Sequence, residues 1–157
     1  MINLKGLVST IALMSVSQVI FAANPKILST YPELSQALTE GHSVRAIMTL
    51  NKCKADSTEV KKADVIGGAN FTNFNIYQLE ENGEKKNIIA TSTHMLLEHG
   101  KFGTVYHYGR IRVYEDNTVK VFNEYLDPKA FTKHKAVSFT CHLSNGTDKN
   151  GVVLYDI

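Results

Sequence analysis

Residues 107–128 read HYGRIRVYEDNTVKVFNEYLDP, and this stretch decides the fold. Two runs rich in Val, Ile, Tyr and Phe flank the step Asp116-Asn117, whose residue types accept the positive φ of a tight hairpin turn. A connection this short forces the two strands to lie antiparallel. A three-residue loop with Asn117 in the left-handed conformation sets Val113 opposite Val119. The stretch therefore predicts an antiparallel β-hairpin.

Strand and turn alternate on both sides of this hairpin. Further steps with the composition of tight turns are Asn82-Gly83, His99-Gly100 and Asn145-Gly146. The segment SVRAIMTL (43–50) is also rich in strand formers. The remaining candidate strands are Ile66–Leu79, Asn87–Leu97, Phe102–Glu115, Thr118–Leu126, Ala136–Leu143 and Val152–Tyr155. We expect a strongly curled antiparallel β-meander of about seven strands, either barrel-like or a half-open roll.

An amphipathic helix is predicted before the strands, within the segment STYPELSQALTEGH (29–42). Thr30 and Glu33 have the spacing of a capping box, and Pro32 lies in the first turn, where its missing N–H costs little. Gly41 is placed to end the helix. The apolar stripe is Leu34, Ala37 and Leu38. Because this stripe is narrow, we expect the N-terminal helix to pack by one face on the meander, which makes the fold class α+β, mainly β.

The first 22 residues have the layout of a secretory signal peptide. Lys5 is followed by an uncharged stretch of apolar and small residues that ends in Phe21-Ala22-Ala23. Polar residues interrupt this stretch too often for a convincing membrane span, although an uncleaved membrane anchor is the alternative. We expect cleavage after Ala22 and export through the Sec pathway. The mature chain is then a single domain over residues 23–157, periplasmic or secreted, without stable membrane insertion.

The sequence contains two cysteines, Cys53 and Cys141. An exported protein meets an oxidising compartment, and an even cysteine count fits one disulfide there. The two cysteines are 88 positions apart, so a disulfide between them would close a long loop. On the chain-entropy model such a bridge would stabilise the fold by roughly 4–5 kcal/mol. The alternative is a cysteine nucleophile or a thiolate metal pair. No CxxC step supports it, and a lone exported thiol tends to oxidise.

Composition and motif spacing exclude several classes of function. The 17 Lys and Arg residues nearly balance the 15 Asp and Glu residues, which gives no case for nucleic acid as a partner. The stretch HMLLEH (94–99) is one residue too long for the HExxH and HxxEH metal motifs. In a strand, its two histidines would point to opposite faces. We therefore expect no metal and no cofactor.

Five polar side chains form a candidate ligand lining. A two-residue loop at His99-Gly100 pairs Glu98 with Lys101 and brings several polar residues to one mostly apolar inner face. The candidate lining is Ser92, His94, His107, Asn123 and Tyr125. These groups can instead satisfy one another or bind ordered water in the core, or they can form a catalytic or metal site. The absence of a carboxylate from this face weakens acid–base chemistry.

The other face of the strand Phe102–Glu115 interleaves aromatic and basic side chains. This candidate interaction face is Tyr106, Tyr108, Arg110, Arg112 and Tyr114. Such a surface can bind a glycan, a nucleic acid or a protein. The alternative is an ordinary solvated sheet face on which arginine side chains stack on neighbouring rings.

Four stretches of the sequence carry a resemblance to a known family. They are TYPELSQALTEGHSVRAIMTLNKC (30–53), STHMLLE (92–98), HYGRIRVYEDNTVKVFNEYLDP (107–128) and SFTCHLSNG (138–146). In order and spacing they resemble the VirK family of exported bacterial proteins, named from virulence regulons. Cys53 and Cys141 lie where the family pattern has its cysteines, and His94 matches its Thr-His step. The resemblance implies an exported single-domain protein linked to host interaction, and it carries over no catalytic residue.

Three functions fit these features. The first is a non-enzymatic interaction protein, a virulence-associated factor that acts in the envelope or on a host through a protein or glycan partner. The second is a carrier of a small apolar ligand inside the curled sheet. The third is a hydrolase or metal enzyme that uses His94 and His107, and the absence of a matching motif makes it the weakest.

Overall fold

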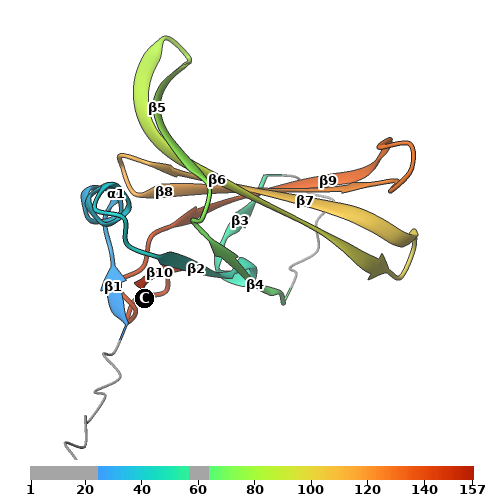
Figure 1. Cartoon of the computed structure of the whole chain (residues 1–157), viewed down its shortest axis with the longest axis horizontal. Helices are drawn as coiled ribbons and strands as arrows, with labels where there is room; N and C mark the ends of the chain where they lie inside the picture. The colour runs from blue at the N-terminus through green and yellow to red at the C-terminus, as the bar shows by residue number, and fades with distance from the viewer. Residues whose placement is uncertain (1–24, 57–63) are drawn as a thin grey trace, which may run out of the picture.

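The computed structural model describes residues 25–56 and 64–157, so the expected signal peptide over residues 1–22 lies outside the described residues. The described chain forms two antiparallel sheets and an α-helix (Figure 1). The four-stranded sheet, which we call the small sheet, consists in order of β1 (Lys26–Leu28), β10 (Val152–Asp156), β2 (Val44–Thr49) and β4 (Ile66–Asn70). The six-stranded sheet, which we call the large sheet, consists in order of β3 (Lys54–Ala55), β9 (Lys133–His142), β8 (Thr118–Leu126), β7 (Gly103–Tyr114), β6 (Glu84–His99) and β5 (Phe74–Glu81).

The hydrophobic core lies between these two sheets. One face of the large sheet contributes Ile111, Val113 and Val119, which are at most 3% exposed. The small sheet contributes Ala46 from β2 and Leu154 from β10, both fully buried. Because each fully buried valine or leucine stabilises a fold by roughly 1.5–3 kcal/mol, this shared core holds the two sheets against each other.

The helix α1 (Tyr31–Thr39) begins at the predicted capping box. The Glu33 carboxylate accepts hydrogen bonds from the backbone N–H groups of Ser29 (2.7 Å) and Thr30 (3.1 Å). The hydrogen bond from Ser29 is the largest cause of a lowered pKa for Glu33. Gly41 follows the helix in the left-handed conformation, with φ +84°. The buried side chains of the helix are Leu34, Ala37 and Leu38, as the sequence predicted.

The position of this helix differs from the expected one. It contacts β2 and lies at one end of the two sheets instead of covering a face of a meander (Figure 1). The backbone N–H of Tyr31 donates to the side-chain oxygen of Asn117, in the turn between β7 and β8 (2.7 Å). A stripe of three buried residues is enough to close the end of the core but not to cover a sheet. Within the described ranges, no helix is long and apolar enough to cross a membrane.

The expected curled, barrel-like meander is wrong, because the strands divide between two sheets. Residues 71–73 split the predicted strand Ile66–Leu79 into β4 and β5, which belong to different sheets. The hydroxyl of buried Thr91 donates to the backbone carbonyl of Asn73 and holds this break (2.7 Å). The edge strands of the large sheet, β3 and β5, are not paired with each other in the described chain. The β5–β6 hairpin bends away from the rest of the large sheet (Figure 1).

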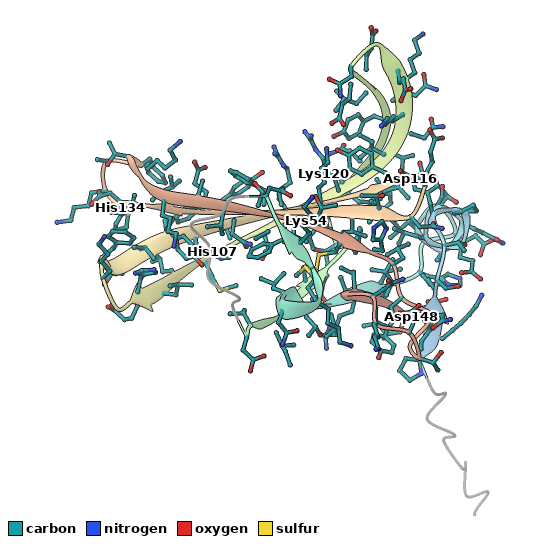
Figure 2. The ribbon with its side chains drawn as sticks, turned by 180° about the vertical axis from the view of Figure 1, so that it is seen from behind. Lys54, His107, Asp116, Lys120, His134 and Asp148 are labelled. Atoms are coloured by element: carbon teal, nitrogen blue, oxygen red, sulfur yellow. A yellow bond between two sulfur atoms is a disulfide. The ribbon has the colours of Figure 1, made fainter. Side chains whose placement is uncertain are left out.

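The predicted disulfide between Cys53 and Cys141 is confirmed (Figure 2). Cys141 lies on β9 of the large sheet, whereas Cys53 follows a short 3-10 helix, η1 (Leu50–Lys52), that comes directly after β2 of the small sheet. Because β3 begins at the next residue and pairs Lys54 with Thr140 of β9, the bridge holds the chain to the large sheet where it arrives from the small sheet, with the two Cα atoms 4.6 Å apart. Gly151 packs against it, and a Cβ at that position would collide with the Cys53 sulfur.

The β7–β8 hairpin has the predicted register. Val113 pairs with Val119, and His107 pairs with Tyr125. Asn117 adopts the left-handed conformation with φ 65°, as its residue type predicted. The register of this hairpin could therefore be predicted from the residue types in its turn.

The β6–β7 hairpin has a different register from the predicted one. Glu98 pairs with Thr104, three positions beyond the predicted partner Lys101. Gly103, and not Gly100, takes the left-handed conformation (φ +70°), which lengthens the loop. An odd shift turns every side chain of a strand to the opposite face. The polar lining predicted for β6 therefore points away from the core.

Candidate functional site

An apolar cleft lies between the two sheets, and we call it the inter-sheet cleft. Its volume is about 470 Å³. The small sheet lines it through β2 and β4, and the large sheet lines it through β6, β7, β8 and β9. The main apolar side chains are Met48, Met95, Leu97, Val121, Val137 and Phe139. A space of this size accepts a small organic molecule.

Gly109 on β7 makes room for the cleft. A Cβ at this position would lie 3.2 Å from Thr93 Cγ2 and 3.6 Å from Asn123 Oδ1. Gly109, Thr93 and Asn123 all line the cleft. Gly109 is not among the positive-φ residues, so the obstacle to a larger residue is space and not backbone strain. Any side chain at this position would therefore project into the cleft wall.

His107 and Asn123 form the polar corner of the cleft. His107 Nε2 lies 3.0 Å from Asn123 Oδ1, and the amide oxygen can only accept, so Nε2–H donates this hydrogen bond. The other ring nitrogen, Nδ1, is buried and has no hydrogen-bond partner among the described residues. A buried polar atom without a partner is rare and costs free energy. His107 Nδ1 is therefore an unsatisfied polar atom in the wall of the cleft.

Five rings run in a row from the cleft along the large sheet, and we call them the ring strip. In order they are His107, Tyr125, His99, Phe102 and His134. Successive ring centroids lie 5.1, 5.2, 4.6 and 4.9 Å apart. His107 and Tyr125 also line the cleft, so the strip begins inside it. Figure 2 shows His107 and His134 on the half of the large sheet that extends beyond the small sheet.

The predicted ligand lining divides between the two faces of the large sheet. The residues at the cleft are His107, Asn123 and Tyr125. Ser92 pairs with Arg110 and His94 pairs with Tyr108, which places both on the opposite, outer face. The cause is the shifted register of the β6–β7 hairpin. Because His94 and His107 lie on opposite faces of one sheet, they cannot act together on one substrate or metal ion.

The five predicted interaction residues share the outer face of the large sheet, which points away from the small sheet. Tyr108 and Arg110 line an open hollow there together with Ser92 and Tyr77. Its volume is about 840 Å³, and residues 74–77 of β5 line one side of it. This hollow is larger than the inter-sheet cleft, but it is open to solvent, whereas two sheets enclose the cleft. The cleft therefore suits a small molecule better, and the hollow suits a larger partner.

Two of these interaction residues are held by Glu81 on β5. Tyr114 donates its hydroxyl to Glu81 Oε1 (3.0 Å), and Arg112 Nη1 lies 3.8 Å from the same oxygen. Lys120 Nζ lies 3.4 Å from Glu81 Oε2, on the same face (Figure 2). Burial raises the pKa of the Glu81 carboxyl, but the Tyr114 hydrogen bond and the charges of Lys120 and Arg112 outweigh burial and hold this pKa below its usual value. This part of the outer face therefore has a structural role.

Sequence reasoning missed Glu81 and the outer rings of the strip. Glu81 precedes an ordinary turn, and its partner Tyr114 lies 33 positions further along the chain, so no local pattern joins them. His99 and His134 come together only through Phe102, which stacks between them. The one available signal was Gly103, because a loop ending at this glycine places His99 beside Phe102.

These features define a class: a disulfide-joined β-protein of two antiparallel sheets with an apolar cleft between them. The family model described as VirK protein matches residues 27–131, so the chain belongs to the VirK family. The chain is similar in fold to the crystal structure of lpg1832, a VirK family protein from Legionella pneumophila, with a TM-score of 0.63 and 12% identity. This likeness covers 82% of this chain and 98% of that chain. No curated protein matches the sequence.

The disulfide also bears on the cellular compartment. Thiols stay reduced in the cytosol of most organisms, so a structural disulfide indicates a compartment other than the cytoplasm. The family model confirms the membership of the VirK family that the sequence predicted. The structure confirms the predicted disulfide.

Proposed function

We propose that this protein is an exported, non-enzymatic binding protein that carries a small apolar ligand in the inter-sheet cleft. The cleft itself carries the proposal, with about 470 Å³ of mainly apolar space between two sheets. Ligand pockets typically have volumes of roughly 300–1,000 Å³, an apolar lining and a small number of polar groups. The cleft has these properties, and the His107–Asn123 pair supplies the polar groups.

The position of the disulfide supports a preformed site. Phe139 lies in one wall of the cleft, two residues before Cys141 on β9. Leu50 lies in the other wall, three residues before Cys53. The bridge therefore fixes, before a ligand arrives, the place where the chain passes from one wall to the other. A preorganised site loses less conformational entropy on binding.

A matched pair of glycine variants tests this function. The neutral apolar dye N-phenyl-1-naphthylamine should bind the purified, oxidised protein with enhanced fluorescence. Gly109→Val should weaken this binding by about tenfold or more, because the new side chain fills the cleft wall. Gly100→Val is the control, since a Cβ at that turn position meets nothing within 4 Å. Equal dye affinity in both variants, with both folded in a thermal melt, would exclude the cleft.

Native mass spectrometry of gently purified protein gives an independent readout. A co-purified small molecule that is lost from Gly109→Val and retained by Gly100→Val would support the carrier function. A second variant, Met95→Gln, makes the cleft more polar at a side chain that is already 46% exposed, so it should weaken dye binding without unfolding the protein. Unchanged dye binding in this variant would argue against an apolar site.

Export through the Sec pathway to the periplasm or the medium belongs to the same proposal. The layout of residues 1–22 and the disulfide support it. Mass mapping of protein from separated periplasm and medium should find a chain that begins at Ala23 with both cysteines oxidised. Two free thiols in the native protein would contradict the proposed export to an oxidising compartment.

The outer hollow supports a second candidate function, an interaction with a protein or glycan partner in the envelope or on a host. Tyr108 and Arg110 line this hollow beside Tyr77. Tyrosine and arginine are enriched where binding energy concentrates at protein interfaces. Replacing Tyr108 and Arg110 together with Ala should abolish crosslinking to a partner, whereas Lys129→Ala, at an exposed loop position, should not. Crosslinking that survives the double change would exclude this face.

A further inference from the structure

We infer that the ligand of the inter-sheet cleft is an amphipathic organic anion, with its hydrocarbon chain in the cleft and its anionic head group on the ring strip. This inference rests on the proposed carrier function and adds the chemical class of the ligand. It concerns the polar end of the site, which an apolar ligand alone does not explain. The shared chemistry is one alkyl chain and one carboxylate or phosphate group.

The ring strip and the cleft form one continuous surface. His107 and Tyr125 line the cleft and are also the first two rings of the strip. The strip then continues through His99 at the end of β6 and Phe102 in the β6–β7 loop. A chain bound among the apolar side chains would therefore meet imidazole and phenol groups where it leaves the cleft. Such groups donate hydrogen bonds to a head group.

This surface carries cations and lacks carboxylates. Lys135 pairs with Tyr125 across β8 and β9, so the register places it on the face of the strip. Lys101 Nζ lies 5.4 Å from the centre of the Phe102 ring. Within β6, β7, β8 and β9, all of them fully described, no Asp or Glu shares the strand face of His107. An anion beside His107, Tyr125 and His99 would thus meet no carboxylate of these strands, whereas the charge of the Asp127 carboxylate acts on His134 at the far end of the strip.

The nearby acids are engaged elsewhere. Glu98 lies on the outer face and accepts a hydrogen bond from the Thr104 hydroxyl. Glu124 pairs with Tyr108 and also lies on the outer face. Asp127 Oδ1 accepts hydrogen bonds from the backbone N–H groups of Lys129 (2.9 Å) and Ala130 (2.7 Å) in its own loop. Glu98 and Glu124 lie on the outer face because successive side chains of a strand point to opposite faces of the sheet.

His107 is the polar residue at which the cleft meets the ring strip. Its Nε2–H is used by Asn123, and its buried Nδ1 has no partner among the described residues. The Tyr125 hydroxyl and the Lys135 ammonium, on the same strand face, can donate hydrogen bonds to an anionic oxygen beside this ring. Charge-assisted hydrogen bonds of this kind are roughly twice as strong as neutral ones.

Binding of three matched amphiphiles to the purified, oxidised protein tests the inference. The probes are dodecanoate, dodecyl phosphate and dodecanol, each used below its micelle-forming concentration and measured by displacement of N-phenyl-1-naphthylamine. We expect at least one of the two anions to bind about tenfold tighter than the alcohol. Which anion it is distinguishes a fatty-acid source from a phospholipid source.

Variants locate the head group. The pair Lys135→Gln and His107→Gln, combined, should lower the ratio of anion affinity to dodecanol affinity to about one. Lys135→Gln alone, at an exposed position, should remove part of the preference for the anion and keeps the test valid if the double variant fails to fold. His94→Gln is the matched control, because His94 lies on the outer face, and it should retain the preference.

The outcomes separate this inference from the proposed function. Equal binding of dodecanol and both anions would overturn the anion inference and leave the apolar cleft in place. Failure of all three to displace the dye, or a dye site insensitive to Gly109→Val, would overturn the carrier function and the inference together. An anion preference that survives the double variant would place the head group away from the ring strip and overturn the inference.

Discussion

Asn117 and Tyr31 lie 86 positions apart in the chain, and the Asn117 side-chain oxygen accepts a hydrogen bond from the backbone N–H of Tyr31 at 2.7 Å. Asn117 is also the left-handed residue of the β7–β8 turn, with φ 65°. One side chain thus shapes the central hairpin and accepts a free N–H at the start of α1. Helices begin with N–H groups that have no partner within the helix, so such an acceptor stabilises both elements.

The two roles of Asn117 can be separated by substitution. Asn117→Gly keeps the left-handed turn and loses the hydrogen bond, which should lower the free energy of unfolding by about 1 kcal/mol. Asn117→Ala loses both, and should lower it by about 2–3 kcal/mol because alanine disfavours positive φ. Urea unfolding at neutral pH measures both values. Equal losses in the two variants would show that the turn conformation does not limit stability.

Gly151 should be intolerant of a side chain because of its contact with the disulfide. A Cβ there would overlap the Cys53 sulfur and lie 3.2 Å from the Thr49 carbonyl oxygen. We expect Gly151→Ala to destabilise the oxidised protein by about 1–3 kcal/mol. In a Cys53→Ala, Cys141→Ala background the same change should cost less, because the sulfur is absent. An unchanged cost in that background would assign the strain to the backbone contact.

The disulfide itself should contribute a large share of the stability. The bridge closes a loop with a sequence separation of 88. Loss of such a cross-link should lower the free energy of unfolding by roughly 4–5 kcal/mol on the chain-entropy model. Urea unfolding with and without reductant checks this value. A midpoint that does not move on full reduction would contradict it.

The capping carboxylate of Glu33 should contribute to acid sensitivity. Backbone hydrogen bonds hold the pKa of Glu33 below its ordinary value of 4.5 in the folded state. Its stabilisation is therefore fully present above about pH 4.5 and is lost as the pH falls through the lowered folded-state pKa. Glu33→Gln should flatten the decline of unfolding free energy in this range. A decline identical to that of the parent protein would show that Glu33 is not coupled to folding.

Tyr114 and Glu81 should be energetically coupled. The hydroxyl of Tyr114, a residue that is only 3% exposed, donates to the Glu81 carboxylate at 3.0 Å. A double-mutant cycle with Tyr114→Phe and Glu81→Gln should give a coupling energy of about 1–2 kcal/mol. Tyr108→Phe is the control, because Tyr108 lies in the middle of β7, six positions from Tyr114, and its coupling to Glu81→Gln should be near zero. The same coupling for both tyrosines would point to a general effect of charge.

The features predicted correctly are those decided by neighbours along the chain. The capping box of α1 joins Thr30 and Glu33, and the β7–β8 turn depends on Asn117 alone. The register predicted for the β6–β7 hairpin was wrong because two glycines there, Gly100 and Gly103, are each compatible with a turn. The stacking of His99 on Phe102 accompanies the longer loop, and a contact of this kind is not visible in the order of residue types.

That single loop also explains why the candidate site was only partly predicted. His107, Asn123 and Tyr125 belong to β7 and β8, whose register was predicted correctly, and they lie at the cleft. Ser92 and His94 belong to β6 and were placed on the wrong face by a shift of three positions. The alternation of residue types along a strand predicts which of its residues share a face. The length of the loop then decides which of these two sets lies on the same side of the sheet as a given set of the neighbouring strand.

By itself, the sequence determined that the chain is mainly β, that a capped helix begins after Thr30, and that Cys53 and Cys141 form a pair. Only the tertiary structure decided that the strands divide into two sheets with a cleft between them. The pairing of β1 with β10, which sets Leu28 opposite Leu154, joins the two ends of the described chain. Such a long-range pairing is decided by the total apolar area that the whole molecule buries when it folds. A local pattern of residues does not contain this information.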